Sequence, residues 1–220
     1  MSLPEITAYP MPQAADLPTP KVSWRIDPDR AVLLIHDMQR YFLRAFPADQ
    51  QPVVDLVTNI DRLRRAFATA GAPVVYTGQP GDMRPEDRRL LGEFWGPGMS
   101  AREHDRGIID KLAPTAQDRL FTKWRYTALF GNGLLEHLQD LGRDQLVICG
   151  VYANAGCLMT ASHAFTHSIQ PFLVADALAD FTEEGHHAAL AYCAEFLGVP
   201  LTTDTAVDGL MGPTQLRPAA

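Results

Sequence analysis

Short apolar runs alternate with segments of helical periodicity along the chain. The runs predict strands at residues 31–35, 73–77, 120–123, 145–151, 171–175 and 200–203. Apolar residues at helical spacing, several ended by glycine, predict helices over 56–70, 134–141, 156–167 and 183–197. Strands that alternate with helices predict an α/β fold, a Rossmann-like parallel sheet with right-handed crossovers and helices on both faces.

One domain accounts for the chain of 220 residues, because nothing in its pattern separates a second core. Residues 1–27 hold five prolines and no periodicity, which predicts an extended arm lying over the domain. The folded domain is expected to span 28–207, followed by a loose tail over 208–220.

The composition limits the kinds of binding partner and the cellular compartment that we expect for this chain. A net charge of −7 without a Lys/Arg cluster argues against nucleic acid or an anionic membrane as the partner. No apolar run approaches the roughly 20 residues of a membrane span, and no secretory leader is evident. The three cysteines lie in apolar or helix-like segments, so we expect reduced thiols and a cytoplasmic protein.

Polar residues end successive predicted strands: Asp37, Gln79, Lys123 and the group Tyr152 to Asn154. Ligands of open α/β sheets bind outside the carboxyl ends of the strands, so these side chains should converge on one site. Asp37 follows an unbroken apolar run and is a candidate general acid, although a turn cap or a structural pairing with arginine would explain it equally well in isolation.

A long connection over residues 80–119 separates the second and third strands. It exceeds what a crossover needs and carries Arg88, Arg89, Phe94 and Trp95. Connections of this length often serve as active-site lids. We therefore expect this segment to cover the site.

The chain resembles the isochorismatase-like hydrolases, and within them the isochorismatase branch. The likeness spans most of the chain and rests on the segments LIHDMQRYF (34–42), YTGQP (76–80), FWGPG (94–98), TKWRY (122–126), CGVYA (149–153) and VADALADF (174–181). Within that branch, residues 39–43 and the N-terminal arm are most similar to the phenazine-pathway hydrolases of 2-amino-2-deoxyisochorismate. The siderophore isochorismatases are similar to a lesser degree.

The family also contains cysteine hydrolases, in which a nucleophilic cysteine follows the fourth strand. Gly156 occupies that position here, and Cys157 comes one residue later, where a helical turn of about 100° directs it away from Asp37 and Lys123. His163 and His167 are four apart but lack a third ligand nearby in sequence, so no metal is expected.

The resemblance implies hydrolysis of an enolpyruvyl vinyl ether, with release of pyruvate and no cofactor. Asp37 would donate the proton, while Lys123 and Arg88 would bind the two carboxylates of the substrate and thereby raise the pKa of Asp37. It also implies a cis peptide between Val151 and Tyr152. Other residues are also expected to contact the substrate. Phe42, Trp95 and Tyr126 would form apolar walls, and Gln79 and Tyr152 would donate or accept hydrogen bonds. Gly156 would leave room for the ring or a water.

Asn154 departs from the branch, which generally has histidine there, and it too is expected to touch the substrate. We expect 2-amino-2-deoxyisochorismate as substrate, giving trans-2,3-dihydro-3-hydroxyanthranilate; the alternative is a stand-alone isochorismatase giving 2,3-dihydro-2,3-dihydroxybenzoate. The chain is expected to act as a homodimer on a freely diffusing dianion, without a fused carrier domain. A cysteine amidase using Cys157, or a binding module without catalysis, would be the competing interpretations.

Overall fold

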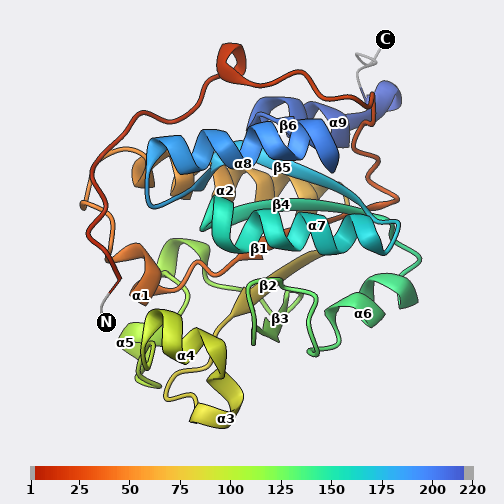
Figure 1. The fold of residues 1–220 in the computed structure, drawn as a ribbon. Coiled ribbons are helices and arrows are strands. Elements are labelled where there is room, and N and C mark those ends of the chain that lie inside the picture. Colours follow the sequence, from red (N-terminus) through yellow and green to blue (C-terminus); the bar gives the residue numbers. More distant parts are fainter. Residues whose placement is uncertain (1–2, 216–220) are drawn as a thin grey trace.

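The computed structural model describes residues 3–215, which form a six-stranded parallel sheet covered by helices on both faces (Figure 1). The strand order is β3-β2-β1-β4-β5-β6, with every neighbouring pair parallel. The strands are β1 (Ala31–His36), β2 (Val74–Gly78), β3 (Arg119–Thr122), β4 (Gln145–Val151), β5 (Gln170–Ala179) and β6 (Val199–Leu201). The predicted α/β fold class is confirmed.

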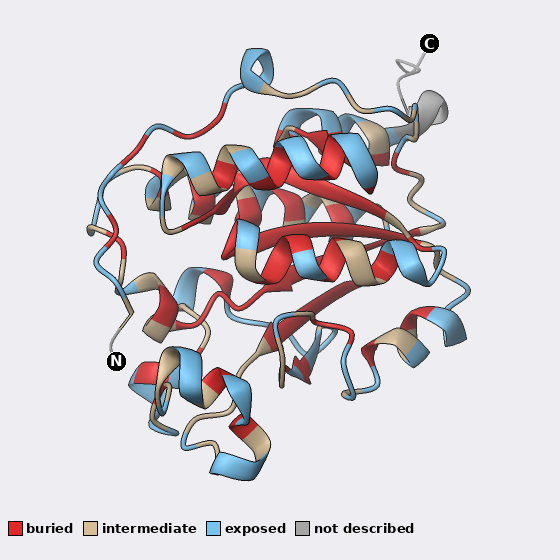
Figure 2. Cartoon of the chain, in the orientation of Figure 1, coloured by how far each residue is buried: buried red, intermediate tan, exposed pale blue. Residues whose placement is uncertain are grey.

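Two hydrophobic cores lie on opposite faces of the sheet. On one face, Leu33 and Ile35 of β1 pack in a core with α2 (Val53–Thr69) and α9 (Thr203–Gln215). On the other, Val32 and Leu34 share a core with α6 (Leu134–Asp140), α7 (Leu158–Thr166) and α8 (Glu183–Phe196). Alternate residues of the central strands therefore face opposite cores; β1 and β4 are buried throughout their length, whereas the edge strand β3 is largely exposed (Figure 2).

The chain reverses its direction across the sheet between β1 and β4. From β1 it proceeds outward through β2 and β3, then returns to place β4 along the other side of β1. Strand order reverses at this point, and a crevice forms there beyond the carboxyl ends of the strands. Asp37 directly follows β1, and Tyr152 directly follows β4.

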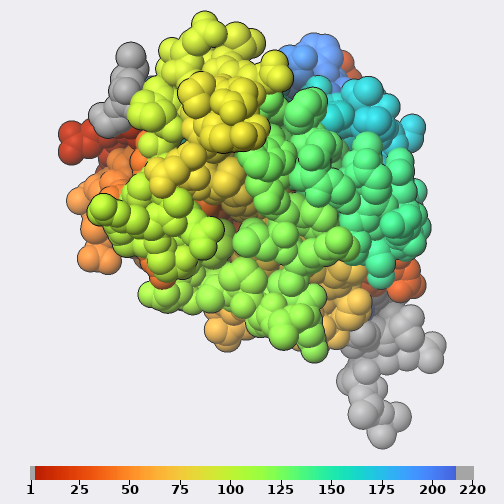
Figure 3. All heavy atoms as spheres, turned by 90° about the horizontal axis from the view of Figure 1, so that it is seen from below, coloured from red at the N-terminus to blue at the C-terminus, as the bar shows by residue number. Residues whose placement is uncertain are grey.

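The connection between β2 and β3 folds over this edge of the sheet. It contains α3 (Pro85–Arg88), α4 (Leu90–Trp95), α5 (Glu103–Arg106) and the 3-10 turn η2 (Asp110–Leu112). In Figure 1 these helices lie together below the sheet, near α1 (Arg40–Leu43), and in Figure 3 they cover much of the lower face. Sequence periodicity missed these helices because each spans only four to six residues.

The N-terminal segment runs extended over the domain, broken by the 3-10 turn η1 (Ala14–Asp16). Ile6, Tyr9 and Met11 are buried within one of the two cores. The Tyr9 hydroxyl accepts a hydrogen bond of 2.7 Å from the backbone N–H of Asp180, which follows β5. This contact ties the segment to the carboxyl end of the sheet.

The C-terminal end differs from the loose tail predicted to begin at 208. α9 continues through that boundary to Gln215, because Ala206 and Leu210, one helical turn apart, are both buried against the sheet. Residues 216–220 lie outside the described part of the chain. Among the described helices, none is long and apolar enough to cross a membrane.

Candidate active site

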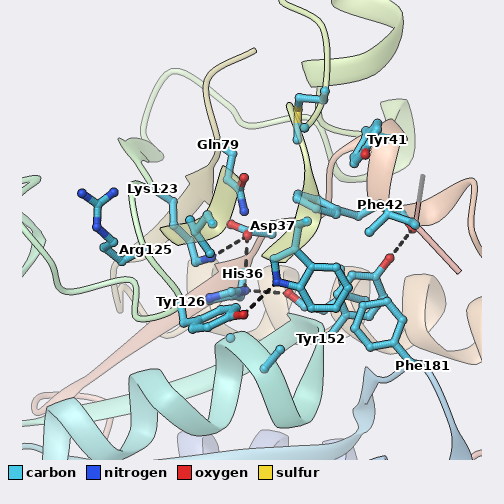
Figure 4. A pocket seen from close by; sticks show the side chains of 18 of the residues that line it. His36, Asp37, Tyr41, Phe42, Gln79, Lys123, Arg125, Tyr126, Tyr152 and Phe181 are labelled. Carbon is cyan, nitrogen blue, oxygen red and sulfur yellow. Dashed lines mark hydrogen bonds and ion pairs between the residues drawn. The ribbon is translucent and has the colours of Figure 1, made fainter. Parts of the chain in front are cut away.

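A pocket lies at the crevice between the ends of β1 and β4, and most of the predicted site residues line it (Figure 4). The strand-end residues Asp37, Gln79, Lys123 and Tyr152 meet there. The covering connection contributes Arg88 and Trp95, and the remaining predicted residues on its walls are Phe42, Tyr126 and Gly156. The polar ends of four strands therefore converge on one site, as the parallel topology requires.

Asp37 and Lys123 form a buried ion pair at the centre of the pocket. The Lys123 Nζ lies 2.9 Å from Asp37 Oδ2, and the two side chains are 3% and 4% exposed, respectively. Thr77 of β2 donates a hydrogen bond of 2.8 Å to Asp37 Oδ1. Asp37 has a φ of 51°, in the left-handed region that aspartate tolerates better than most residues.

The protonation state of Asp37 depends on opposing influences. Burial alone would raise its pKa, but the positive charge of Lys123, with the hydrogen bonds from Lys123 and Thr77, holds the pKa below its usual value. Asp37 is thus a carboxylate in the ligand-free protein at neutral pH. Any proton donation requires a change in its surroundings.

Gln79 is fixed through its backbone by Gln39, which directly precedes α1. The Gln39 side chain accepts from the Gln79 N–H at 2.8 Å and donates to the Gln79 carbonyl at 2.9 Å and the Arg106 carbonyl at 2.7 Å. The Gln79 side chain itself points into the pocket toward Asp37 (Figure 4). Gln39 therefore joins the end of β2 to the covering connection.

Arg88 brings a cation to the pocket that no carboxylate neutralises within residues 3–215. The side chain is 7% exposed, and its Nε donates to the Gly96 carbonyl at 2.5 Å. Glycine suits position 98, because its φ is 83° and a Cβ there would lie 2.6 Å from the guanidinium, which would have to move. Burial lowers the pKa of Arg88, but arginine stays charged in proteins, so the group favours an anionic ligand.

Aromatic side chains from separate elements form one wall of the pocket. The Phe181 ring stacks on Tyr152 with 3.9 Å between centroids and on Trp95 with 5.6 Å. The Trp95 Nε1 donates to the Tyr126 hydroxyl at 2.8 Å, which joins α4 to the segment after β3. The wall offers a planar apolar surface to a ring-shaped ligand.

Two sequence expectations need correction. Tyr152 was expected to hydrogen-bond the substrate, but its hydroxyl donates to the Phe42 carbonyl at 2.9 Å. This hydrogen bond is internal to the protein, and Tyr152 presents its ring to the pocket. Asn154 does not line the pocket; its side chain is exposed, and its backbone N–H donates to Asp180 Oδ2 at 2.7 Å. Asn154 lies in a π-helical turn, Ala153–Cys157, in which the buried residues are Ala153, Gly156 and Cys157.

The role expected for Gly156 also changes. The space its missing side chain leaves is filled by the imidazole of His36, since a Cβ at 156 would lie 2.4 Å from His36 Cε1. The following Cys157 is fully buried outside the pocket, and burial raises the pKa of its thiol well above its usual value. The cis peptide expected between Val151 and Tyr152 is present.

Sequence reasoning missed several residues of the pocket. His36 is hidden in the apolar run of β1, and Phe181 follows β5 beyond the end predicted for that strand. Arg125 also lines the pocket, where its guanidinium donates to the Asp87 carbonyl at 2.8 Å. Lys123 and Tyr126, in the same segment, were predicted as site residues. Proximity to them in the sequence is the only feature that could have pointed to Arg125. Across residues 3–215, no three His, Cys, Asp or Glu side chains gather in a metal-binding arrangement.

Comparisons with known proteins agree with this geometry. The isochorismatase domain matches residues 31–205. The chain is 50% identical over 206 residues to phenazine biosynthesis protein PhzD1 of Pseudomonas aeruginosa, covering 94% of this chain and 99% of that protein. It is also 50% identical over 210 residues to an isochorismatase of Bacillus subtilis, covering 96% of this chain and 67% of that protein.

Solved structures share the fold at low identity. A cysteine hydrolase from Pseudomonas syringae superposes with a TM-score of 0.79 at 20% identity, covering 87% of this chain and 97% of the other. The likeness in structure supports the fold alone. The family follows from the domain match over residues 31–205 and from the relatives at 50% identity: the chain belongs to the isochorismatase family of hydrolases.

Proposed function

We propose that this enzyme hydrolyses the enolpyruvyl vinyl ether of 2-amino-2-deoxyisochorismate, with Asp37 as the general acid. One observation carries the proposal: the buried Asp37–Lys123 pair adjoins a residue without a side chain, Gly156, so the site holds an acid and a cation but no nucleophile. Relatives of this chain include phenazine biosynthesis proteins matched along nearly their full length. A vinyl ether is cleaved by an acid without covalent catalysis.

The cations of the pocket suit a substrate with two carboxylates. Within the described residues, Arg88 has no carboxylate partner, and the only carboxylate paired with Lys123 is that of Asp37. A substrate carboxylate close to Lys123 would compete for its charge and place a second anion beside Asp37. Both effects raise the pKa of Asp37, and burial acts in the same direction. Substrate binding thus converts a carboxylate into an acid by proton uptake.

The reaction then proceeds through a cationic intermediate. Asp37 transfers its proton to the terminal vinyl carbon, which becomes a methyl group, and the ether carbon becomes an oxocarbenium ion. Water adds to that carbon and loses a proton to the Asp37 carboxylate. The resulting hemiketal collapses to pyruvate and the ring alcohol, with the bond between the ring carbon and its oxygen intact. The aromatic wall of Trp95, Tyr152 and Phe181 lies where it can hold the ring.

A stand-alone isochorismatase is the second candidate, supported by the 50% identity to the Bacillus subtilis isochorismatase. The two substrates differ by an amine or a hydroxyl at ring carbon 2. Discrimination between them rests on one or two polar contacts, each of roughly 1–3 kcal/mol. We therefore expect isochorismate to be hydrolysed as well, with a lower specificity constant.

The test is steady-state pyruvate release from 2-amino-2-deoxyisochorismate, isochorismate and chorismate, coupled to lactate dehydrogenase. The variant Asp37→Asn, which keeps the shape but has no proton to donate, should lose at least about 100-fold in kcat while still binding substrate. Activity of that variant within a few-fold of wild type would exclude Asp37 as the acid. A specificity constant for isochorismate at least about tenfold above that for the amino compound would favour the second candidate.

A further inference from the structure

His36 lies in the floor of the pocket, at the end of β1 and next to the catalytic pair. It is fully buried, and its Nδ1 lies 2.7 Å from the Val151 carbonyl oxygen. Because a carbonyl only accepts, Nδ1 carries the proton. Burial lowers the pKa of His36 to about 4, so the ring is neutral at neutral pH. Its Nε2 is buried without a hydrogen-bond partner among the described residues.

The imidazole occupies the volume that any side chain at position 156 would enter. A Cβ at 156 would lie 2.4 Å from Cε1, 3.0 Å from Nε2 and 3.3 Å from Nδ1 of His36. Carbon atoms do not approach so closely, and the ring cannot swing aside, since it is packed on all sides and tethered to the Val151 carbonyl. His36 and a side chain at 156 are therefore sterically incompatible.

This exclusion matters because position 156 shares the pocket with Asp37 and Lys123. A carboxylate next to an ammonium group is an arrangement that can deprotonate and stabilise a thiol. The chain keeps both activating groups, 2.9 Å apart, but offers no nucleophile between them. Its own neighbouring thiol, Cys157, is buried outside the pocket.

We propose that His36 is a specificity-determining residue: by filling the side-chain volume of position 156, its imidazole keeps a nucleophile away from the Asp37–Lys123 pair. Asp37 is thereby reserved for proton donation, a consequence that rests on the proposed function. The steric exclusion itself does not rest on it. His36 acts through the space it fills, and no contact with the substrate is required.

The first arm of the test is a double-mutant cycle between His36 and Gly156, with the melting temperature Tm as the readout. Gly156→Ala should lower Tm by roughly 5 °C or more in the otherwise native chain, because the new methyl overlaps the ring. In a His36→Ala background the same change should cost less than about 1 °C, because the methyl then enters vacated space. The matched control is Gly92→Ala in α4, whose Cβ would meet Arg88 Cγ at an ordinary 3.7 Å and should show no coupling to His36.

The second arm measures thiol chemistry, which a purely structural role for His36 would not change. Gly156→Cys is compared with Gly156→Cys/His36→Val, and His36→Val alone reports the background of the three buried native cysteines. Iodoacetamide should alkylate residue 156 of the double variant at least about tenfold faster than that of the single variant at pH 7, as located by mass spectrometry.

Each outcome is decisive. If Gly156→Cys fails to fold and His36→Val restores folding, the exclusion is supported; if folding is not restored, it is refuted. Equal alkylation rates for the single and double variants would overturn the proposal, as would equal Tm costs of Gly156→Ala in the two backgrounds. Neither arm uses the hydrolysis reaction, so a failure to release pyruvate would count against the proposed function and leave this inference standing.

Discussion

The Asp37–Lys123 pair provides a quantitative test of the electrostatics of the site. Its side chains are 4% and 3% exposed with 2.9 Å between the charged atoms, so both groups have lost their water. Removing one partner of such a pair leaves an uncompensated buried charge, which costs about 3–5 kcal/mol. Lys123→Met should therefore lower the free energy of unfolding by about that amount at pH 8. The exposed pair Arg62–Asp204 is the matched control, where Arg62→Met should cost less than about 1 kcal/mol.

The cost of Lys123→Met should depend on pH with a defined sign. In the native chain, the pKa of Asp37 lies below its usual value. Without Lys123, burial remains the main influence and raises that pKa above the unfolded value. A carboxylate with a raised folded pKa loses stability as pH rises through it. The variant should therefore be closer to wild type at pH 5 than at pH 8.

Urea unfolding of wild type, Lys123→Met, Asp37→Asn and the double variant at both pH values measures this. The double variant should cost less than the sum of the single changes, because it leaves no charge unpaired, and it should lose the added pH dependence. Coupling below about 0.5 kcal/mol would show that the two groups do not interact and would refute the reasoning.

Three further predictions concern other groups. Cys157→Ala should keep most of the pyruvate-releasing activity, and iodoacetamide should not abolish activity of the native enzyme; loss of activity in a folded Ala variant would favour a thiol mechanism. Arg88→Ala should lower kcat/KM at least about tenfold, whereas the exposed neighbour Arg89→Ala should leave it nearly unchanged; equal effects would remove Arg88 from substrate binding. Burial lowers the pKa of His186 from its usual 6.5 to about 4, so the unfolded chain takes up a proton first and the free energy of unfolding should fall as pH drops through that window. His186→Asn should flatten the fall measured by urea unfolding, and an unchanged slope would contradict the assignment.

The sequence predicted the parts of the molecule that follow from strong periodicity. Asp37, Gln79, Lys123 and Tyr152 end parallel strands, and parallel topology alone brings strand ends to one edge, so their convergence was predictable. The six strands and the helices α2, α6, α7 and α8 were also predictable, because most of them bury a continuous apolar face, whereas the order of the strands was not.

Other features depend on contacts between residues distant in sequence. His36 looks like part of an apolar run, and only its packing against position 156 shows why glycine stands there. The Tyr152 hydroxyl is committed to the Phe42 carbonyl, 110 positions away, which no local pattern indicates. Asn154 is adjacent in sequence to the pocket residues, yet the turn 153–157 directs its side chain outward.

The most direct test of the account is the position of the bond that the enzyme breaks. Hydrolysis in water enriched in ¹⁸O distinguishes attack on the oxocarbenium carbon from attack on the ring, when the ring product is weighed by mass spectrometry. Protonation of the vinyl carbon by Asp37 leaves the bond between the ring carbon and its oxygen intact, so the ring product should carry no label and pyruvate should receive it. Label in the hydroxyl of the ring product would show cleavage at the ring carbon and would contradict the mechanism.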